Sequence, residues 1–114
     1  MIEPLQYQPI IEKLFEKTAS GRVPWEENGQ DKFRCDLDQY KFFVWRSDDG
    51  YGLRTEDEFQ RVLFLVRAEE EIIYRDPEKE HLFQLLSDLF ELARRKALNV
   101  PDKLAGVAQL LDKI

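Results

Sequence analysis

Cysteine and histidine each occur only once in this chain of 114 residues, as Cys35 and His81. A single cysteine excludes an internal disulfide, which is typical of proteins in a reducing compartment. A structural zinc site uses about four cysteine or histidine ligands, so we expect no bound metal. His81 follows Glu78 and Glu80, and we expect it to be a charged surface residue. We expect Cys35, in the middle of a strand, to be a buried and unreactive thiol.

Long apolar runs and phosphate-binding loops are also missing from the sequence. No apolar stretch approaches the roughly 20 residues of a membrane-spanning helix, and Met1–Pro4 lacks the basic and apolar regions of a signal peptide. There is no glycine-rich phosphate loop, and the acidic clusters do not have the ligand spacing of a calcium loop. We therefore expect a cytoplasmic protein that binds no cofactor, contacts no membrane and is not an enzyme.

Basic residues are fewer than acidic ones, 17 against 23, which gives a net charge of −6. An acidic domain repels phosphate backbones, so we expect no nucleic-acid partner. The one basic cluster, Arg94–Lys96, stands where cations complement the dipole at the end of a helix.

The composition is that of a folded protein. Hydrophobic residues make up 43% of the chain and aromatic residues 12%, values that indicate a globular domain rather than a disordered segment. The length suits a single domain that spans residues 1–114.

The last third of the chain predicts two helices joined by a tight turn. Asp76 can cap the first helix, and Pro77 suits its first position. Asn99 tolerates the left-handed conformation that ends a helix, and Pro101 prevents the first helix from continuing.

Each of these helices carries an apolar stripe at three- and four-residue spacing. The stripes are Leu82, Leu85, Leu86, Leu89, Phe90 and Ala93 in the first helix, and Leu104, Val107, Ala108, Leu111 and Ile114 in the second. Because the connection is short, we expect the two helices to be neighbours packed on a sheet. We expect Leu86 and Leu89 in the core with Leu111 close to them.

The first part of the chain predicts a third helix. Because proline breaks a helix interior, we expect the regular helix to begin near Pro9, and Gly21 is suited to end it. The loop Arg22–Asp31 follows and contains Trp25. Trp25 is either a plug over the edge of the core or a platform for a ligand.

The middle of the chain predicts an antiparallel β meander. Phe33–Leu37 alternates apolar and polar residues, Tyr40–Arg46 is rich in aromatics, and Arg61–Arg67 contains an apolar run of strand length. After an acidic turn, we expect Ile72–Arg75 to form a further strand that pairs with the preceding one. The chain is therefore predicted to be α+β, with an N-terminal helix, a meander of three to four strands and a C-terminal helix pair packed on the sheet.

Two alternatives stay open within this meander. The segment Gly50–Phe59 is either a loop throughout or contains a short edge strand at Tyr51–Arg54. Thr55–Glu58 matches a capping box that could open a helix. We prefer a strand for the run that follows, because its apolar residues do not fall on one helical face.

The order of these elements resembles a set of small bacterial proteins of uncharacterised function. The resemblance rests on Gly21, on Trp25 with Glu26 after the first helix, and on the run LFELARRKALNV, residues 89–100. It implies the same order of elements and a bacterial cytoplasmic setting, and it implies no catalytic residues.

Two strands are apolar on both faces. By strand alternation Phe42 and Val44 point to one face, while Phe43 and Trp45 point to the other. The apolar run Val62–Val66 likewise places apolar side chains on both faces of its strand. Either helices cover both faces of the sheet, or one face is a contact surface for a protein partner or a second copy.

We therefore expect a non-catalytic protein-interaction or regulatory module, of the antitoxin-like or immunity-like kind, with a partner protein or self-association. Phe43 and Trp45 are the candidate contact residues. The alternative is a small-ligand-binding domain with a pocket between sheet and helices, in which Trp25 is the platform.

Overall fold

The computed structural model describes the backbone of residues 4–69 and 77–114, and the side chains of residues 8–69, 80–99 and 102–114. In chain order the elements are α1 (Pro4–Ala19), β1 (Glu26–Glu27), β2 (Lys32–Leu37), β3 (Tyr40–Ser47), β4 (Gly50–Glu56), β5 (Val62–Glu69), α3 (Pro77–Ala97) and α4 (Val100–Asp112). The α+β prediction is confirmed. None of the described helices is both long enough and apolar enough to span a bilayer.

The strands form one antiparallel sheet in the order β1-β2-β3-β4-β5. Within the described residues the sheet therefore has five strands instead of the three to four that the sequence predicted. Two-residue turns join β2 to β3 and β3 to β4, and Asp38 adopts a left-handed φ of 59° in the first of these turns. The prediction failed to count β1, which has only two residues, and β4, in which glycines weaken the strand pattern.

β4 is an inner strand, because β3 pairs with one of its sides and β5 with the other. The loop alternative is wrong. Tyr51–Arg54 does form a strand, as the other alternative held, but this strand is longer and is not at an edge of the sheet. A side chain at Gly50 would collide with the backbone oxygen of Ala68 on β5, so glycine here allows two backbones to approach closely. The helix alternative fails as well, since Thr55 and Glu56 pair within the sheet.

α1 begins at Pro4 and continues through Pro9, so the predicted start near Pro9 is wrong. A proline inside a helix removes one backbone hydrogen bond, and the exposed ring of Pro9 leaves the buried side of the helix undisturbed. The predicted end at Gly21 is confirmed. Gly21 has a φ of 78°, its N–H donates to the Thr18 carbonyl at 3.0 Å, and the Arg22 N–H donates to the Lys17 carbonyl at 3.1 Å.

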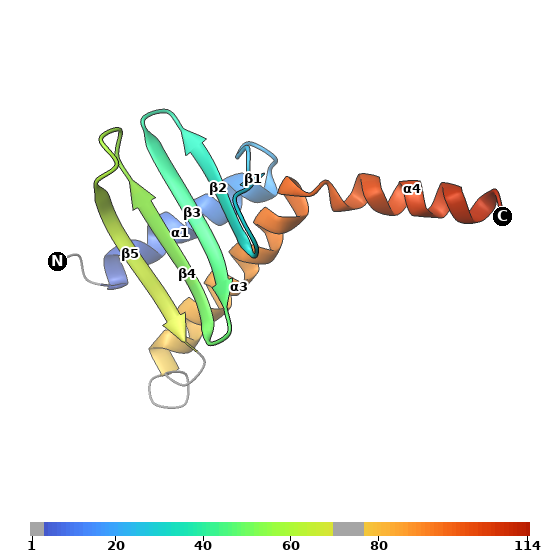
Figure 1. Cartoon of the computed structure of the whole chain (residues 1–114). Helices are drawn as coiled ribbons and strands as arrows, with labels where there is room; N and C mark the ends of the chain where they lie inside the picture. The colour runs from blue at the N-terminus through green and yellow to red at the C-terminus, as the bar shows by residue number, and fades with distance from the viewer. Residues whose placement is uncertain (1–3, 70–76) are drawn as a thin grey trace.

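α1 and α3 lie side by side on the same face of the sheet, behind it in the view of Figure 1. Their apolar stripes and the inner face of the sheet form one core, made of Ile11, Leu14, Val23, Trp25, Phe33, Cys35, Val44, Leu53, Phe64, Val66, Ala68, Leu86, Leu89, Phe90 and Ala93. The predicted burial of Leu86 and Leu89 is confirmed. α3 starts at Pro77, as predicted. The proposed cap Asp76 and the segment Ile72–Arg75 fall outside the described residues.

α4 does not pack on the sheet. Asn99 takes the predicted left-handed conformation, with φ 51° and ψ 46°, but the turn directs α4 away from the body, as Figure 1 shows. Leu111 is 64% exposed, so its predicted place beside Leu86 and Leu89 is wrong. The physical reason is that α1 and α3 already occupy the inner face of the sheet and bury its apolar residues in the shared core.

Candidate protein-contact face

The second face of the sheet carries both candidate contact residues. The strand register places Phe42 and Val44 on the inner face, where Val44 lies opposite Phe33 and Leu53. Phe43 and Trp45 therefore lie on the opposite face, as alternation predicted. Both helices that pack on the sheet lie on the inner side (Figure 1). Within the described part of the chain, then, no helix covers the face of Phe43 and Trp45, which we call the open face.

Phe43 is only 7% exposed even though none of the described helices covers it. The Arg54 guanidinium lies 4.5 Å from the centre of its ring, and the Lys32 ammonium lies 5.2 Å from it. These cations interact favourably with the electron-rich ring and shield it with their aliphatic stems. Phe43 is therefore the centre of an aromatic and cationic cluster, which the sequence could not reveal without the register.

Trp45 is half-buried and lies across Gly52 of the neighbouring strand. A Cβ at position 52 would lie 2.2 Å from Cζ2 of the indole, so the ring rests directly on the glycine backbone. An aromatic residue that covers a glycine across the strand pair fixes both the strand register and its own orientation. The indole is thus held in a fixed pose, with part of its surface open to solvent.

Two arginines of the open face are neutralised by nearby carboxylates. Arg34 lies 3.2 Å from Glu26 and 3.7 Å from Asp36. Arg54 Nε lies 2.9 Å from the carboxylate of Glu56. These pairs hold the guanidinium groups along the sheet, and their net charge is small.

Two other cations flank Trp45, and neither has a carboxylate partner among the described residues. Lys32 lies directly opposite Trp45 on β2, and Arg67 lies opposite Gly52 on β5. Neither forms an ion pair with any described residue. The side chains on either side of Trp45 and Gly52 are therefore both cations, in a chain whose net charge is −6.

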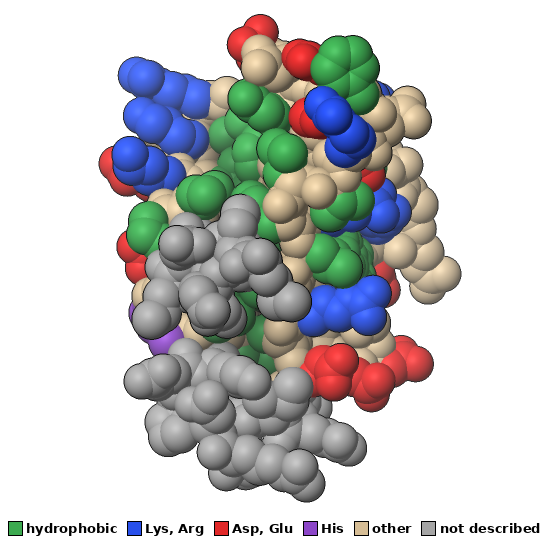
Figure 2. All heavy atoms as spheres, turned by 90° about the vertical axis from the view of Figure 1, so that its left-hand side faces the viewer, with side chains coloured by type: hydrophobic (Ala, Val, Ile, Leu, Met, Phe, Trp, Pro, Cys, Tyr) green, Lys and Arg blue, Asp and Glu red, His purple; other side chains and the backbone are tan. Residues whose placement is uncertain are grey.

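Exposed apolar side chains extend this surface onto β5. Leu63 and Leu65 are each 44% exposed, and Leu65 lies opposite Arg54 on the open face. Figure 2 looks onto the edge of the sheet formed by β5 and shows hydrophobic side chains gathered along this edge, bordered by basic and acidic groups. Leucines beside a central aromatic pair form an arrangement typical of a contact surface.

A hollow of about 300 Å³ lies at one end of the open face. It is lined by Trp45, Ser47, Asp49, Tyr51, Arg67 and Glu69. Its volume is at the lower end of the range for small-molecule pockets, and its lining is more polar than is usual for them.

Trp25 is part of the core. It is 6% exposed, and its indole Nε1–H donates to Thr18 Oγ1 at 2.9 Å. The Thr18 hydroxyl in turn donates to the Leu14 carbonyl at 2.7 Å. Both faces and the polar edge of the indole are thus used within the fold. This geometry favours the plug interpretation, and the ligand-platform interpretation stays a prediction without structural support.

The histidine, the cysteine and the basic cluster that the sequence singled out each lie in an ordinary structural environment. His81 is exposed, with Nε2 3.8 Å from a Glu12 carboxylate oxygen. Cys35 is fully buried. The pKa of its thiol is raised to about 12, chiefly by this burial and secondly by the negative charge of Asp36. Arg94–Lys96 occupies the last turn of α3, as predicted. In residues 8–69, 80–99 and 102–114 no three His, Cys, Asp or Glu side chains are grouped to hold a metal ion.

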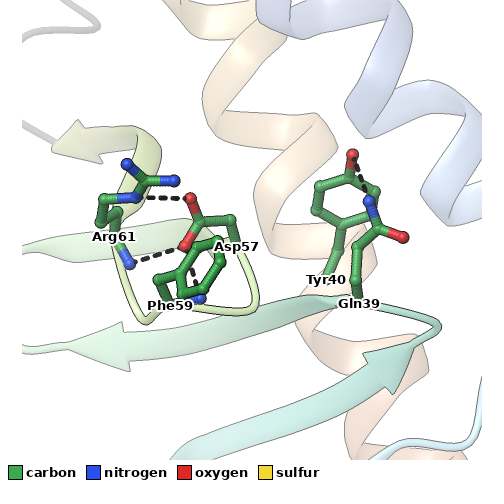
Figure 3. A network of polar contacts seen from close by, with 5 residues as sticks. All are labelled: Gln39, Tyr40, Asp57, Phe59 and Arg61. Atoms are coloured by element: carbon green, nitrogen blue, oxygen red, sulfur yellow. Dashed lines mark hydrogen bonds and ion pairs between the residues drawn. The ribbon is translucent and has the colours of Figure 1, made fainter.

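The tips of two hairpins carry polar networks (Figure 3). In the β4–β5 loop, Asp57 Oδ1 accepts the backbone N–H groups of Phe59 at 2.9 Å and Arg61 at 3.0 Å, and Oδ2 accepts Arg61 Nε–H at 2.9 Å. The hydrogen bond from the Arg61 backbone is the main cause of the lowered pKa of Asp57. At the β2–β3 turn, Gln39 donates to the Tyr40 hydroxyl at 3.2 Å. The partners that the described residues give the Asp57 carboxylate all lie within its own loop, which is the arrangement of a turn-stabilising group.

Comparison of the chain with family models, with curated proteins and with solved structures gives no match. The resemblance to small bacterial proteins therefore stays a hypothesis.

Proposed function

We propose that this chain is a non-catalytic protein-interaction module and that the open face around Trp45 and Phe43 is its contact surface. The observation that carries this proposal is the fixed, half-buried indole of Trp45 on a sheet face that no described helix covers. Tryptophan is enriched among the residues that dominate binding energy in protein interfaces. A rigid anchor loses little conformational entropy when a partner docks.

The charges of the open face favour a partner segment that carries carboxylates. Lys32 and Arg67 flank Trp45 and have no acidic partner in the described part of the chain. A carboxylate placed beside them would gain a charge-assisted hydrogen bond and would be steered to this face. A partner that lacks such groups would leave these cations desolvated and unpaired, which is costly.

The finer proposal is a regulatory, antitoxin-like or immunity-like binder in a bacterial cytoplasm. It rests on the resemblance of element order and of the LFELARRKALNV run. A module of this kind acts by occupying a partner's surface, which requires an anchored contact face and no reactive group.

A paired capture experiment tests the contact surface. A photoreactive amino acid placed at Lys41, which lies on the open face beside Phe43 along β3, should cross-link the partner in cells of the source organism. The same group placed at Lys13, on the exposed side of α1, should not. Trp45→Ser in the position-41 protein should reduce the cross-linked product at least about tenfold, because it removes the anchor.

Two outcomes would contradict the proposal. One is equal cross-linking from positions 41 and 13, and the other is a cross-link that Trp45→Ser leaves unchanged while the chain stays folded. The cross-linked partner also tests the charge argument, since its contacting segment should be rich in Asp or Glu.

The hollow beside Trp45 favours small-ligand binding as a second candidate function. It is lined by groups of both charges, Arg67 with Asp49 and Glu69, which suits a small zwitterionic compound. A thermal-shift screen of amino acids and related zwitterions would detect binding through stabilisation of the folded state. Stabilisation that Arg67→Ala removes would favour this candidate over the protein partner.

A further inference from the structure

α4 exposes its whole apolar stripe. Leu104 is 62% exposed, Val107 51%, Leu111 64% and Ile114 93%. The helix projects from the body and has no neighbour along its length in Figure 1. This stripe is therefore separate from the open face of the sheet, and the contact surface proposed above does not use it.

A helix of this length needs a partner. α4 has 13 residues, and isolated helices shorter than about 12–15 residues are marginal in water. In proteins, most helical stability comes from packing of the apolar face. Within the described part of the chain only the turn at Asn99 connects α4 to the body, so none of the described elements supplies this packing.

The spacing of the stripe points to a second copy of the same helix. Leu104, Val107 and Leu111 lie in α4, and Ile114 lies two residues past its last residue, Asp112. The four are separated by three, four and three residues, which is the spacing of the narrow a/d seam of a two-stranded coiled coil. In an antiparallel pair, Leu104 meets Ile114 of the second copy, and Val107 meets Leu111 of the second copy. The twofold axis repeats both contacts, so all four layers are apolar on both sides and the surface is complementary to itself.

The charge distribution of α4 permits this pairing. The described residues of the helix and its end carry Asp102 and Asp112 against Lys103 and Lys113, which sum to zero. The net charge of −6 therefore lies entirely on the rest of the chain. An antiparallel pair also places the two bodies at opposite ends of the seam, where they repel each other least.

We propose that α4 is a self-association element through which two copies of this chain pair in antiparallel orientation. The seam is about 15 Å long and presents one stripe per copy, so it buries less than the roughly 1,200–2,000 Å² of a standard stable interface. The structure therefore assigns a weak, concentration-dependent dimer, with a dissociation constant in the range of about 1 µM to 1 mM.

Sedimentation equilibrium on the full chain over a concentration series of about 10 µM to 1 mM tests the pairing. The wild type should shift from monomer to dimer over this range. Leu111→Glu places a carboxylate in the seam and should raise the dissociation constant at least about tenfold. The matched control Gln109→Glu adds the same charge on the opposite side of α4 and should change it by less than about threefold.

Disulfide trapping tests the orientation. Cys35 is fully buried, so an added exposed thiol is the one that reacts. A mixture of Leu104→Cys and Ile114→Cys chains should form the mixed disulfide on mild oxidation. Either variant alone should not, because identical positions lie about 15 Å apart along an antiparallel seam, beyond the reach of a disulfide.

Each other outcome overturns the inference. A wild type that stays monomeric over the whole range, or a dimer that Leu111→Glu leaves intact, shows that α4 does not pair. Disulfides formed by each variant alone indicate a parallel seam. A dimer that Trp45→Ser weakens and Leu111→Glu does not uses the open face instead, which would overturn the pairing of α4 and leave the proposed contact surface standing.

Discussion

Cys35 shows how strand register decides the chemistry of a single side chain. Its position on the inner face places the thiol in the core, and burial raises the thiol pKa to about 12. A thiolate is the reactive form of cysteine, so the folded chain holds this residue in its unreactive state.

We expect Cys35 in the folded chain to react with an aromatic disulfide reagent at about pH 8 at least a hundredfold more slowly than in the urea-unfolded chain. The pH dependence has a definite sign. Because the folded pKa is raised, the protonated thiol stabilises the fold fully below the ordinary thiol pKa of about 8.5, and this stability is lost as the pH rises toward about 12. Absorbance at the reagent's product band measures the first effect. Rapid labelling of the native chain would contradict the burial.

Gly52 and Trp45 depend on each other, so Gly52→Ala tests how the indole is held. The added methyl would lie 2.2 Å from the ring, so the ring must move. We expect the tryptophan fluorescence spectrum to shift to the red. We also expect the free energy of unfolding to fall by about 1–3 kcal/mol, which is the usual effect of overpacking. Gly106→Ala is the control, because a methyl there meets open space and alanine is favoured in helices by about 0.5–1 kcal/mol. An unchanged spectrum in Gly52→Ala would show that the indole does not rest on the glycine.

At the scale of elements, α3 and α4 carry similar apolar stripes and have opposite surroundings. Leu89 on α3 is fully buried, whereas Leu111 on α4 is 64% exposed. We expect Leu89→Ala to lower the free energy of unfolding by about 2–5 kcal/mol. Leu111→Ala should change it by less than about 0.5 kcal/mol in dilute monomer. Urea unfolding at low protein concentration measures both, and a large loss for Leu111→Ala would show that α4 packs within its own chain.

The β4–β5 loop is fixed by one carboxylate, which makes its order dependent on pH. The lowered pKa of Asp57 means that the ionised form stabilises the loop above the ordinary pKa of about 3.9. This contribution is lost as the pH falls through the lowered folded value. We expect the amide resonances of Phe59 and Arg61, which donate to this carboxylate, to titrate together in that acidic window. Asp57→Asn should abolish this titration, and its persistence in the variant would assign it to another group.

At the scale of the whole molecule, the net charge of −6 opposes binding to phosphate backbones. The aromatic and cationic cluster at the centre of the open face is the feature that could still attract a nucleic acid. However, Phe43 is only 7% exposed beneath Arg54 and Lys32, so its ring offers no free face on which a base could stack.

We therefore expect no gel shift with double-stranded DNA at about 150 mM salt. If a shift occurs, the double variant Arg94→Ala with Arg95→Ala separates two explanations. A shift that this variant abolishes would show that the cluster at the end of α3 binds phosphate, against its interpretation as a group that complements the helix dipole. A shift that Lys32→Ala and Arg67→Ala reduce instead would place the nucleic acid on the open face.

Local signals in the sequence determined much of this fold. Gly21 ends α1, Pro77 begins α3, and Asn99 adopts the left-handed turn before α4. Alternation along β3 placed Phe43 and Trp45 on one face. These features depend on backbone conformation and on neighbours within a few residues, so the pattern of residue types is sufficient to predict them.

The tertiary structure decided what lies opposite these elements. Gly50 and Gly52 weaken the strand pattern of β4, and only the close approach of Ala68 and Trp45 explains why glycine is needed there. The stripe of α4 predicted a buried helix, but α1 and α3 fill the inner face and leave it exposed. An apolar stripe shows that a surface must be covered, and only the packing of the whole chain determines whether the same chain covers it.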